Sequence, residues 1–251
     1  MPQNTQEKTP QKKLADIRKE FSGSENLEPW QQEVDALFHA NQFIQRKARG
    51  VESGGFERDD IFNLHKLALN DPFNMRHAGV LRDVPVIKVL KKFNGELTKA
   101  AFEPTDLTFL SEEFNEFAND LEEKTRDISC DTPVKDLLEL AAKVHRDFTK
   151  MQPFRDGNER TARMLVDYIF VKARLPYIVD WGEKYDEYTD VVFRGYLENR
   201  LDLLQDFLAN KLLERIEGIQ DTLVNYSFNN EEFAEYIDKR YKEVLKFLNL
   251  D

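Results

Sequence analysis

Apolar residues recur at intervals of three and four along most of the chain, which is the spacing of an amphipathic helix. The clearest case runs from Pro133 to Met151, where the apolar positions form a continuous stripe. Thr132 is expected to cap this helix, and Pro153 ends it because its ring disfavours a helical residue before it. The same pattern predicts helices at Leu14–Phe21, Pro29–Arg49, Asp59–Asn70, Leu107–Arg126, Pro133–Met151, Asn158–Ala173, Tyr185–Ile216 and Asn230–Leu248.

One segment breaks the helical pattern. It has the sequence "AGVLRDVPVIKV", which begins at Ala78, alternates between apolar and other residues, and is rich in valine. Valine-rich alternation is typical of a strand or hairpin. Pro85 within it indicates an edge strand, because a proline cannot donate to a sheet ladder. The expected fold class is therefore all-α with one small β-hairpin.

Composition and charge narrow the class of protein. The chain has 251 residues, of which 41% are hydrophobic and 33% charged, and this suffices for one sizeable core domain. Its net charge of −11 speaks against nucleic acid or an anionic membrane as the main partner. Cys130 is the only cysteine, the N-terminus lacks an apolar leader, and no apolar run approaches the ~20 residues of a membrane helix. These features predict a cytoplasmic protein.

The segment "KMQPFRDGNERTAR", which follows the most apolar helix, contains residue types that bind phosphate and metal ions. A helix expected to start at Asn158 would offer its first amides as an anion site, and Gly157 would let the backbone approach a ligand. Arg160 and Arg163 share a helical face and could clamp successive phosphates, while Asp156 could hold a Mg²⁺ that bridges them. The alternative is that these charges only cap a helix and are solvated.

The motif that carries a family resemblance is "QPFRDGNERTAR", which resembles the Fic signature HPFxxGNGRxxR. Its surroundings are similar to Fic elements in the same order: "DDIFNLHKLAL" to the upstream helix, "AGVLRDVPVIKV" to the flap hairpin, and "LLELAAKVHRDFTKMQPF" to the core helix. Downstream, "RMLVDYIFVKARLPYIV" resembles the hydrophobic exit helix, so the resemblance covers about Asp59–Asp180. It implies a Fic-type helical domain over 59–183, an N-terminal tail with helices over 1–58, and a C-terminal helical extension over 184–251.

Fic proteins typically transfer AMP from ATP to a hydroxyl side chain of a target protein, with Mg²⁺. By resemblance, Asp156 is the metal ligand, and Asn158 with the amides near Gly157 holds the α-phosphate. Arg160 and Arg163 serve the β- and γ-phosphates. The resemblance thus turns the general phosphate site into an expected ATP site.

The resemblance also gives a role to the flap, Gly79–Val89, which would bind a target protein by adding it as a strand. The candidate target-binding residues of the flap are Gly79, Arg82, Val84 and Val86. Phe154 is expected to anchor the catalytic loop in the core. The helices after Tyr185 keep three open roles: regulation, homodimer formation, or covering the core.

Two positions depart from the family pattern. Gln152 stands at the catalytic histidine, which acts as general base, and a neutral amide can orient a hydroxyl but cannot take its proton. Glu159 stands at the second glycine, where it could pair with Arg163 and compete for the phosphate site, or simply be solvated. His145 lies about two helical turns before the loop, ~10 Å away, too far to replace the base. His77 lies just before the flap and is the other histidine considered as a replacement for the base.

Three functions fit these observations. The first is a Fic adenylyltransferase with weak or altered activity, and the retained Asp156, Asn158, Arg160 and Arg163 favour it. The second is an inactive nucleotide- or protein-binding module, and Gln152 favours it. The third is a helical interaction protein whose loop binds no phosphate.

Overall fold

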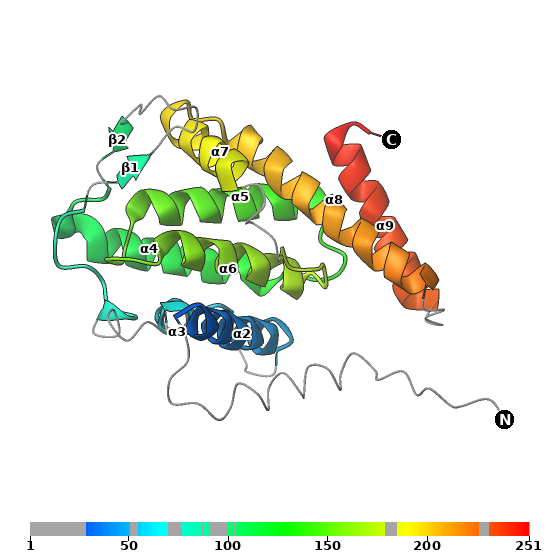
Figure 1. Cartoon of the computed structure of the whole chain (residues 1–251), viewed down its shortest axis with the longest axis horizontal. Helices are drawn as coiled ribbons and strands as arrows, with labels where there is room; N and C mark the ends of the chain where they lie inside the picture. The colour runs from blue at the N-terminus through cyan, green and yellow to red at the C-terminus, as the bar shows by residue number, and fades with distance from the viewer. Residues whose placement is uncertain are drawn as a thin grey trace.

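The structure is a computed structural model that describes residues 29–50, 55–69, 77–86, 88–90, 100–102, 104–178, 185–225 and 231–250. Helices make up most of this part, which confirms the expected all-α class (Figure 1). The elements are α2 (Pro29–Ala48), α3 (Arg58–Leu69), β1 (Lys88–Leu90), β2 (Ala100–Phe102), α4 (Leu107–Arg126), α5 (Val134–Met151), α6 (Asn158–Lys172), α7 (Tyr185–Leu197), α8 (Leu201–Asn225) and α9 (Glu231–Leu248). The helix expected over Leu14–Phe21 lies outside the described residues.

Helix α5 lies at the centre of the fold, as its apolar stripe predicts. Leu138, Ala141 and Phe148 on that stripe are all 0% exposed. Helix α6 lies beside α5, and the short connection between them, residues 152–157, makes the pair an antiparallel hairpin. Figure 1 shows this hairpin between α2 and α3 on one side and α7 and α8 on the other. The hairpin has a loop end, which carries the predicted site, and a far end, which α9 covers.

The long helical stretch expected over Tyr185–Ile216 is wrong in one respect, because it consists of two helices. Helices α7 and α8 are separated by Glu198–Arg200. Asn199 in this break has φ 53°, a left-handed conformation that asparagine tolerates better than most residues. Arg200 then pairs with Asp202 in the first turn of α8, with Nη2 2.6 Å from the carboxylate. The break contains no glycine or proline, and the apolar spacing continues across it, so nothing in the sequence indicates that one helix ends there.

The hairpin is also placed differently from the prediction. Strand β1 pairs antiparallel with β2, and Val89 lies opposite Ala101. Residues 77–86, which include most of the predicted flap, contain no strand. The backbone N–H of Arg82 donates instead to the carbonyl of Pro153 at 2.9 Å, and Pro85 has no N–H to give. This backbone hydrogen bond of the segment therefore goes to the α5–α6 loop rather than to a partner strand.

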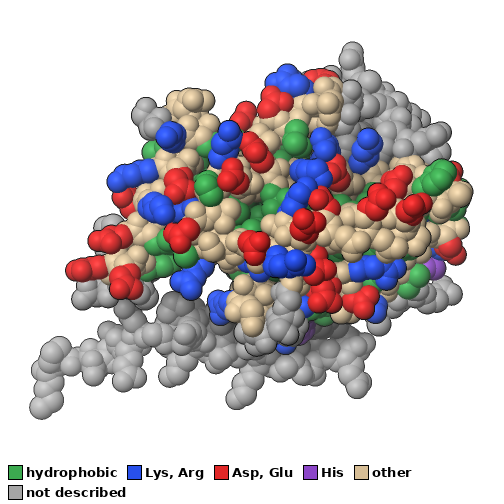
Figure 2. Space-filling model, turned by 180° about the vertical axis from the view of Figure 1, so that it is seen from behind, with side chains coloured by type: hydrophobic (Ala, Val, Ile, Leu, Met, Phe, Trp, Pro, Cys, Tyr) green, Lys and Arg blue, Asp and Glu red, His purple; other side chains and the backbone are tan. Residues whose placement is uncertain are grey.

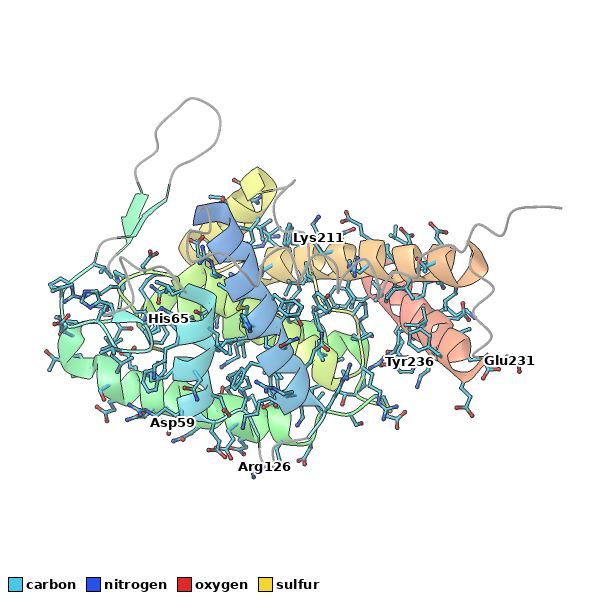
Figure 3. The ribbon with its side chains drawn as sticks, turned by 60° about the horizontal axis from the view of Figure 1, so that its bottom comes forward. Asp59, His65, Arg126, Lys211, Glu231 and Tyr236 are labelled. Atoms are coloured by element: carbon cyan, nitrogen blue, oxygen red, sulfur yellow. The ribbon has the colours of Figure 1, made fainter. Side chains whose placement is uncertain are left out.

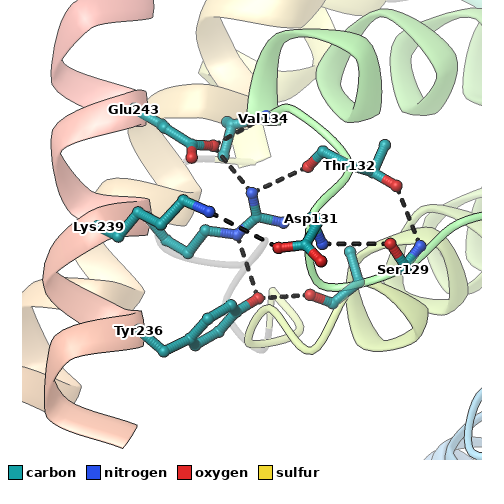
Figure 4. Close-up of polar contacts among 9 residues, drawn as sticks. Ser129, Asp131, Thr132, Val134, Tyr236, Lys239 and Glu243 are labelled. Atoms are coloured by element: carbon teal, nitrogen blue, oxygen red, sulfur yellow. Dashed lines mark hydrogen bonds and ion pairs between the residues drawn. The ribbon is translucent and has the colours of Figure 1, made fainter. Parts of the chain in front are cut away.

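The start of α5 is capped by a distant residue instead of Thr132. The Thr132 hydroxyl accepts from the backbone N–H of Ser129 at 3.0 Å. The amide of Val134 donates to the carboxylate of Glu243 in α9 at 3.2 Å, as Figure 4 shows. A carboxylate at this position also interacts favourably with the positive end of the helix dipole.

The surface carries charges of both signs. Figure 2 shows acidic and basic side chains interspersed over one face of the molecule. Many are exposed pairs one helical turn apart, such as Lys242 with Asp238 and Lys124 with Asp120. An exposed pair of this kind contributes less than about 1 kcal/mol to stability. None of the described helices has the length and apolar character needed to span a membrane.

Candidate functional site

The loop between α5 and α6 begins with a left-handed residue. Gln152 has φ 49° and ψ 59°, a region that residues other than glycine seldom adopt. Its N–H still donates to the carbonyl of Phe148 at 3.1 Å, which closes the last turn of α5. Pro153 follows and cannot continue a helical ladder. The chain consequently turns out of α5 at Gln152, the position of the family's general base.

The side chain of Asn158, the first residue of α6, holds this loop together from inside. Its Oδ1 accepts from the N–H of Phe154 at 2.9 Å, and its Nδ2 donates to the carbonyl of Phe154 at 2.8 Å. The same Nδ2 lies 3.2 Å from Oε1 of Gln152. Asn158 is only 5% exposed, so the residue expected to hold the α-phosphate uses its side chain within the loop.

The amide of Gln152 is engaged at both ends. Its Nε2 donates to the carbonyl of Thr149 at 2.6 Å, while its Oε1 accepts from Asn158. The residue is 7% exposed. An amide has no proton-accepting state near neutral pH. Gln152 thus occupies the place of the base without being able to do its chemistry.

Helix α3 supports the loop through an aromatic cluster. Phe154 is 0% exposed, and its ring stacks on that of His65 with centroids 3.7 Å apart and planes inclined by 16°. The rings of Phe62 and Phe114 each meet it edge-on at 6.0 Å. The expectation that Phe154 anchors the loop in the core is confirmed. Burying a side chain of this size contributes about 1.5–3 kcal/mol.

His65 makes hydrogen bonds through both ring nitrogens. Its Nε2 lies 2.9 Å from the carbonyl oxygen of Asp156 in the loop, and its Nδ1 accepts from the N–H of Gly79 at 2.7 Å. Burial lowers the pKa of His65 to about 4, so the ring is neutral at pH 7. The apolar spacing that predicts this helix gives no sign of the polar contacts that His65 makes with the loop and with Gly79.

Arg82 ties residues 77–86 to the loop. Its guanidinium is buried, with Nε 2.7 Å from the carbonyl oxygen of Gln152 and further bonds to the carbonyls of Val84 and Thr105. An arginine can only donate, so it suits a place where several carbonyls converge. Of the residues expected to meet a target, Arg82 faces the loop, Gly79 contacts α3, Val86 is half-buried and Val84 is exposed.

A second contact joins the same two segments nearer the surface. Arg155 of the loop pairs with the carboxylate of Asp83, with Nε at 3.0 Å. Its Nη1 lies 3.1 Å from Nε2 of His77, and that nitrogen must accept because a guanidinium has no acceptor. His77 is therefore engaged with Arg155 rather than with Gln152. Together with Arg82, these contacts hold residues 77–86 against the loop.

Helix α6 begins beside two carboxylates. Gly157, the N-cap, has φ 72°, and its N–H donates to Oδ1 of the exposed Asp156 at 2.7 Å. Glu159 lies in the first turn of the helix. The positive end of the helix dipole attracts anions, so both side chains stand where a phosphate would be favoured. The geometry supports an anion site that already has acidic neighbours.

The two motif arginines project from α6 toward different helices. Arg160 donates through Nη1 to the carbonyl of Ala68 near the end of α3, at 2.8 Å. Arg163 lies with its Nε 3.4 Å from the backbone oxygen of Glu159 and its guanidinium carbon 5.8 Å from the ring centre of Tyr188 in α7. One of the two side chains therefore contacts α3 and the other lies near α7.

Near Arg163 lie His145, which by its spacing is too far from the loop to act as base, and two polar residues that the sequence did not single out, Tyr188 and Asp167. The hydroxyl of Tyr188 is 2.9 Å from Nε2 of the buried His145, so this histidine is engaged inside the core. Asp167 accepts from the N–H of Ile178 at 2.8 Å, and burial raises its pKa to about 8. The position of Asp167, four residues after Arg163, was the available signal.

The region that contains the loop matches a known protein family. The Fic/DOC family model matches residues 55–170, which include α3, residues 77–86, α4, α5, the loop and most of α6. Residues 55–170 form a Fic/DOC family domain. The resemblance inferred from the loop motif and its surroundings is confirmed.

Two curated proteins are similar to part of this chain. "Protein adenylyltransferase Fic" of Nematostella vectensis is 27% identical over 155 residues, which are 61% of this chain and 31% of that protein. "Protein adenylyltransferase fic-1" of Caenorhabditis briggsae is 27% identical over 149 residues, which are 59% of this chain and 25% of that protein. The chain therefore spans a third or less of the length of these relatives.

Solved structures share the fold at low sequence identity. A Fic domain-containing signalling protein of Bacteroides thetaiotaomicron is 16% identical with a TM-score of 0.63, covering 92% of this chain and 79% of that chain. Residues 134–508 of Fic-1 from C. elegans are 21% identical with a TM-score of 0.59, covering 81% and 58%. These similarities show that the fold is shared over more of the chain than residues 55–170.

Proposed function

We propose that this Fic domain binds ATP at the loop end of the α5–α6 hairpin and transfers AMP slowly to a hydroxyl of a target protein. The observation that carries the proposal is the start of α6, where the exposed Asp156 adjoins the left-handed Gly157 and where Arg160 and Arg163 follow within the first two turns of the helix. A helix N-terminus with two arginines suits a polyphosphate. The 27% identity to two adenylyltransferases supports AMP as the transferred group.

The expected slowness follows from the proton of the attacking hydroxyl. Transfer forms a bond between the hydroxyl oxygen and the α-phosphorus, and it breaks the bond from that phosphorus to the oxygen shared with the β-phosphate. Pyrophosphate leaves, and the hydroxyl proton needs an acceptor. Gln152 cannot take it, so the proton passes to water, and losing a general base costs typically ~10²–10⁴-fold in rate.

The residues present fit a magnesium ion, although the described part of the chain contains no cluster of three or more acidic, histidine or cysteine ligands. Mg²⁺ is usually held by one or two carboxylates together with substrate phosphates, so the single exposed carboxylate of Asp156 is sufficient. The bound ion would neutralise negative charge on the phosphates. Asp156 would hold it while its Oδ1 also orders the amide of Gly157.

Glu159 is proposed to weaken ATP binding. It lies in the first turn of α6, where its negative charge opposes a phosphate at the same dipole. Such a charge at a helix terminus changes a binding free energy by about 0.3–1 kcal/mol at an exposed site. Glu159 therefore tunes affinity, whereas Gln152 limits turnover.

A second candidate function is a nucleotide-binding module that transfers nothing. The observation that favours it is the Gln152 amide, whose donor bonds to Thr149 in the last turn of α5 and whose acceptor bonds to Asn158. A side chain held in this way is not free to orient an incoming hydroxyl. Binding of ATP with no detectable transfer is the outcome expected from this candidate.

Labelled ATP distinguishes the two candidates. The full chain is incubated with Mg²⁺ and either α-labelled or γ-labelled ATP, alone and with a cell lysate, and protein-bound label is followed over hours. AMP transfer leaves α-label on protein and releases γ-label with pyrophosphate. Binding alone gives no covalent label from either, and γ-label on protein would indicate a phosphotransferase and contradict the proposal.

Two variants with the same Asp→Asn change test whether labelling depends on the loop end of the hairpin. Asp156→Asn removes the proposed metal ligand at the loop end of the hairpin and should abolish ATP-dependent labelling. Asp136→Asn makes the same change at an exposed position in the first turn of α5, at the far end. It should label like the parent. Equal loss in both variants would mean that the assay reports folding rather than the site.

A further inference from the structure

His65 joins two segments that the sequence separates. Its Nδ1 accepts from Gly79, at the start of residues 77–86, and must therefore carry no hydrogen. The hydrogen of the neutral ring is then on Nε2, which donates to the carbonyl of Asp156 in the loop. A single tautomer satisfies both partners at 2.7 and 2.9 Å. Figure 3 places His65 on α3, at the opposite end of the molecule from Tyr236 on α9.

The ring is held on its face as well as at its edges. It stacks on Phe154 at 3.7 Å and is 1% exposed, so it has little freedom to turn. The two segments that bond to His65 also lie close against α3. A Cβ on Gly157 would lie 2.4 Å from Leu69 Cδ1, and one on Gly79 would lie 2.8 Å from the carbonyl of Phe62.

Both glycines have positive φ, 67° at Gly79 and 72° at Gly157. They therefore need glycine for their conformation as well as for their approach to α3. Two segments that must both touch the same helix meet at one imidazole. The position of one segment is then fixed relative to the other through His65.

We propose that His65 is a positioning residue that couples residues 77–86 to the catalytic loop. Resting on the proposed function, this means that one side chain sets the distance between the segment expected to meet the target and the Asp156–Gly157 turn expected to meet ATP. His65 touches neither substrate. Removing its hydrogen bonds loosens both segments together, and this is the property that distinguishes coupling from ordinary packing.

Hydrogen exchange of the nucleotide-free chain tests the coupling directly. His65→Phe keeps an aromatic ring against Phe154 and removes both hydrogen bonds. We expect exchange at the amides of Gly79 and Gly157 to accelerate together by roughly fivefold, which corresponds to the loss of about 1 kcal/mol of local hydrogen bonding. Amides in the middle of α5 should keep their protection.

A control variant separates positioning from packing. Ile61→Val removes one methylene from the buried face of the same helix, with Ile61 0% exposed and outside the His65 contacts. It should leave both glycine amides at their parental rates. Acceleration at Gly79 alone, no acceleration at either, or the same pattern in Ile61→Val would each overturn the proposal.

A second variant keeps the test decisive if His65→Phe does not fold. His65→Asn supplies an acceptor toward Gly79 but no donor that reaches Asp156. Coupling predicts accelerated exchange at Gly157 and a smaller acceleration at Gly79, whereas independent segments predict no change at Gly79. Both measurements use protein without nucleotide. Failure of the parent to bind ATP would therefore refute the proposed function and leave this result standing.

Discussion

The two ends of the α5–α6 hairpin are closed by different kinds of contact. At the loop end, the amides of Gln152 and Asn158 bond to each other and the imidazole of His65 bonds to the loop backbone. At the far end, α9 supplies the charged side chains of Arg240 and Glu243, which bond to Thr132 and Val134 (Figure 4). Each end buries one guanidinium, that of Arg82 at the loop end and that of Arg240 at the far end, but the loop end also leaves the carboxylate of Asp156 exposed.

At the far end, side chains of α9 bond to the backbone before α5 and after α6. Arg240 is 0% exposed, and its Nη1 lies 2.9 Å from the carbonyl of Thr132 and 2.8 Å from Glu243. The hydroxyl of Tyr236 donates to the carbonyl of Ala173, just after α6, at 2.5 Å. These contacts satisfy backbone groups that helix ends leave without partners. The loop end is thus held by α3 and residues 77–86, and the far end by α9.

The largest expected effect is on turnover and belongs to the loop end alone. Gln152→His places a base at the end of α5, and we expect AMP transfer to rise by ~10²–10⁴-fold, the usual contribution of general base catalysis. The initial rate of α-label incorporation measures it. Gln152→Asn, which is also unable to take a proton, serves as control. Equal rates in the two variants would show that proton removal does not limit the reaction.

The largest effect on stability should come from the far end. Arg240→Met removes a buried guanidinium and leaves Glu243 and the Thr132 carbonyl without it, which should cost about 3–5 kcal/mol in the free energy of unfolding. Urea unfolding measures the loss, and ATP affinity of the folded variant should stay at the parental value. Lys242→Met, on the exposed face of α9, should cost less than about 1 kcal/mol. Similar losses of stability in Arg240→Met and Lys242→Met would show that the buried contacts of Arg240 contribute no more than an exposed ion pair.

Replacing Gly157 and replacing Gly218 by alanine should change stability in opposite directions. Gly157→Ala forces a Cβ into a left-handed residue and to within 2.4 Å of Leu69, so it should lower stability by about 1–2 kcal/mol and weaken ATP binding. Gly218→Ala in α8 meets nothing within 4 Å and should raise stability by about 0.5–1 kcal/mol. Thermal unfolding measures both. A stabilising Gly157→Ala would mean that the loop is not held against α3 as described.

The smallest effect is electrostatic. Glu159→Gln removes one negative charge from the first turn of α6 while keeping the side-chain length, and ATP should bind about threefold more tightly. Calorimetric titration in low salt measures the change. Glu139→Gln, on the exposed face of α5, removes the same charge far from the loop and should leave the affinity unaltered. Equal tightening in both variants would show an effect of net charge only.

The sequence predicted the elements of the fold better than the contacts between them. The bounds of α4, Leu107–Arg126, agree with the expectation because apolar spacing is a local property. The break at Asn199 was missed because it contains no glycine or proline, and the strands were misplaced because β1 pairs with a segment outside the pattern that suggested it. Glu243 could not be predicted as a cap, since 109 positions separate it from Val134.

The site shows the same division between local and long-range information. Spacing placed Gly157, Arg160 and Arg163 at the start of a helix, and the structure has them there. The motif could not reveal that Asn158 bonds to Phe154 across the loop or that Arg82 is buried against Gln152. Those contacts depend on how distant segments meet. The roles of the site residues toward ATP therefore remain predictions.

On the proposed function, the loop end of the hairpin is an ATP site at which Glu159 lowers the affinity for ATP and Gln152 limits turnover. Calorimetric titration of Mg²⁺ and ATP into the Gln152→His, Glu159→Gly double variant tests it most directly, with the same protein carrying Arg163→Gln as control. We predict saturable binding to the double variant, tighter than to the parent, and loss of most of that affinity with Arg163→Gln. A correctly folded double variant that binds no ATP, or binds it equally well without Arg163, would contradict the account.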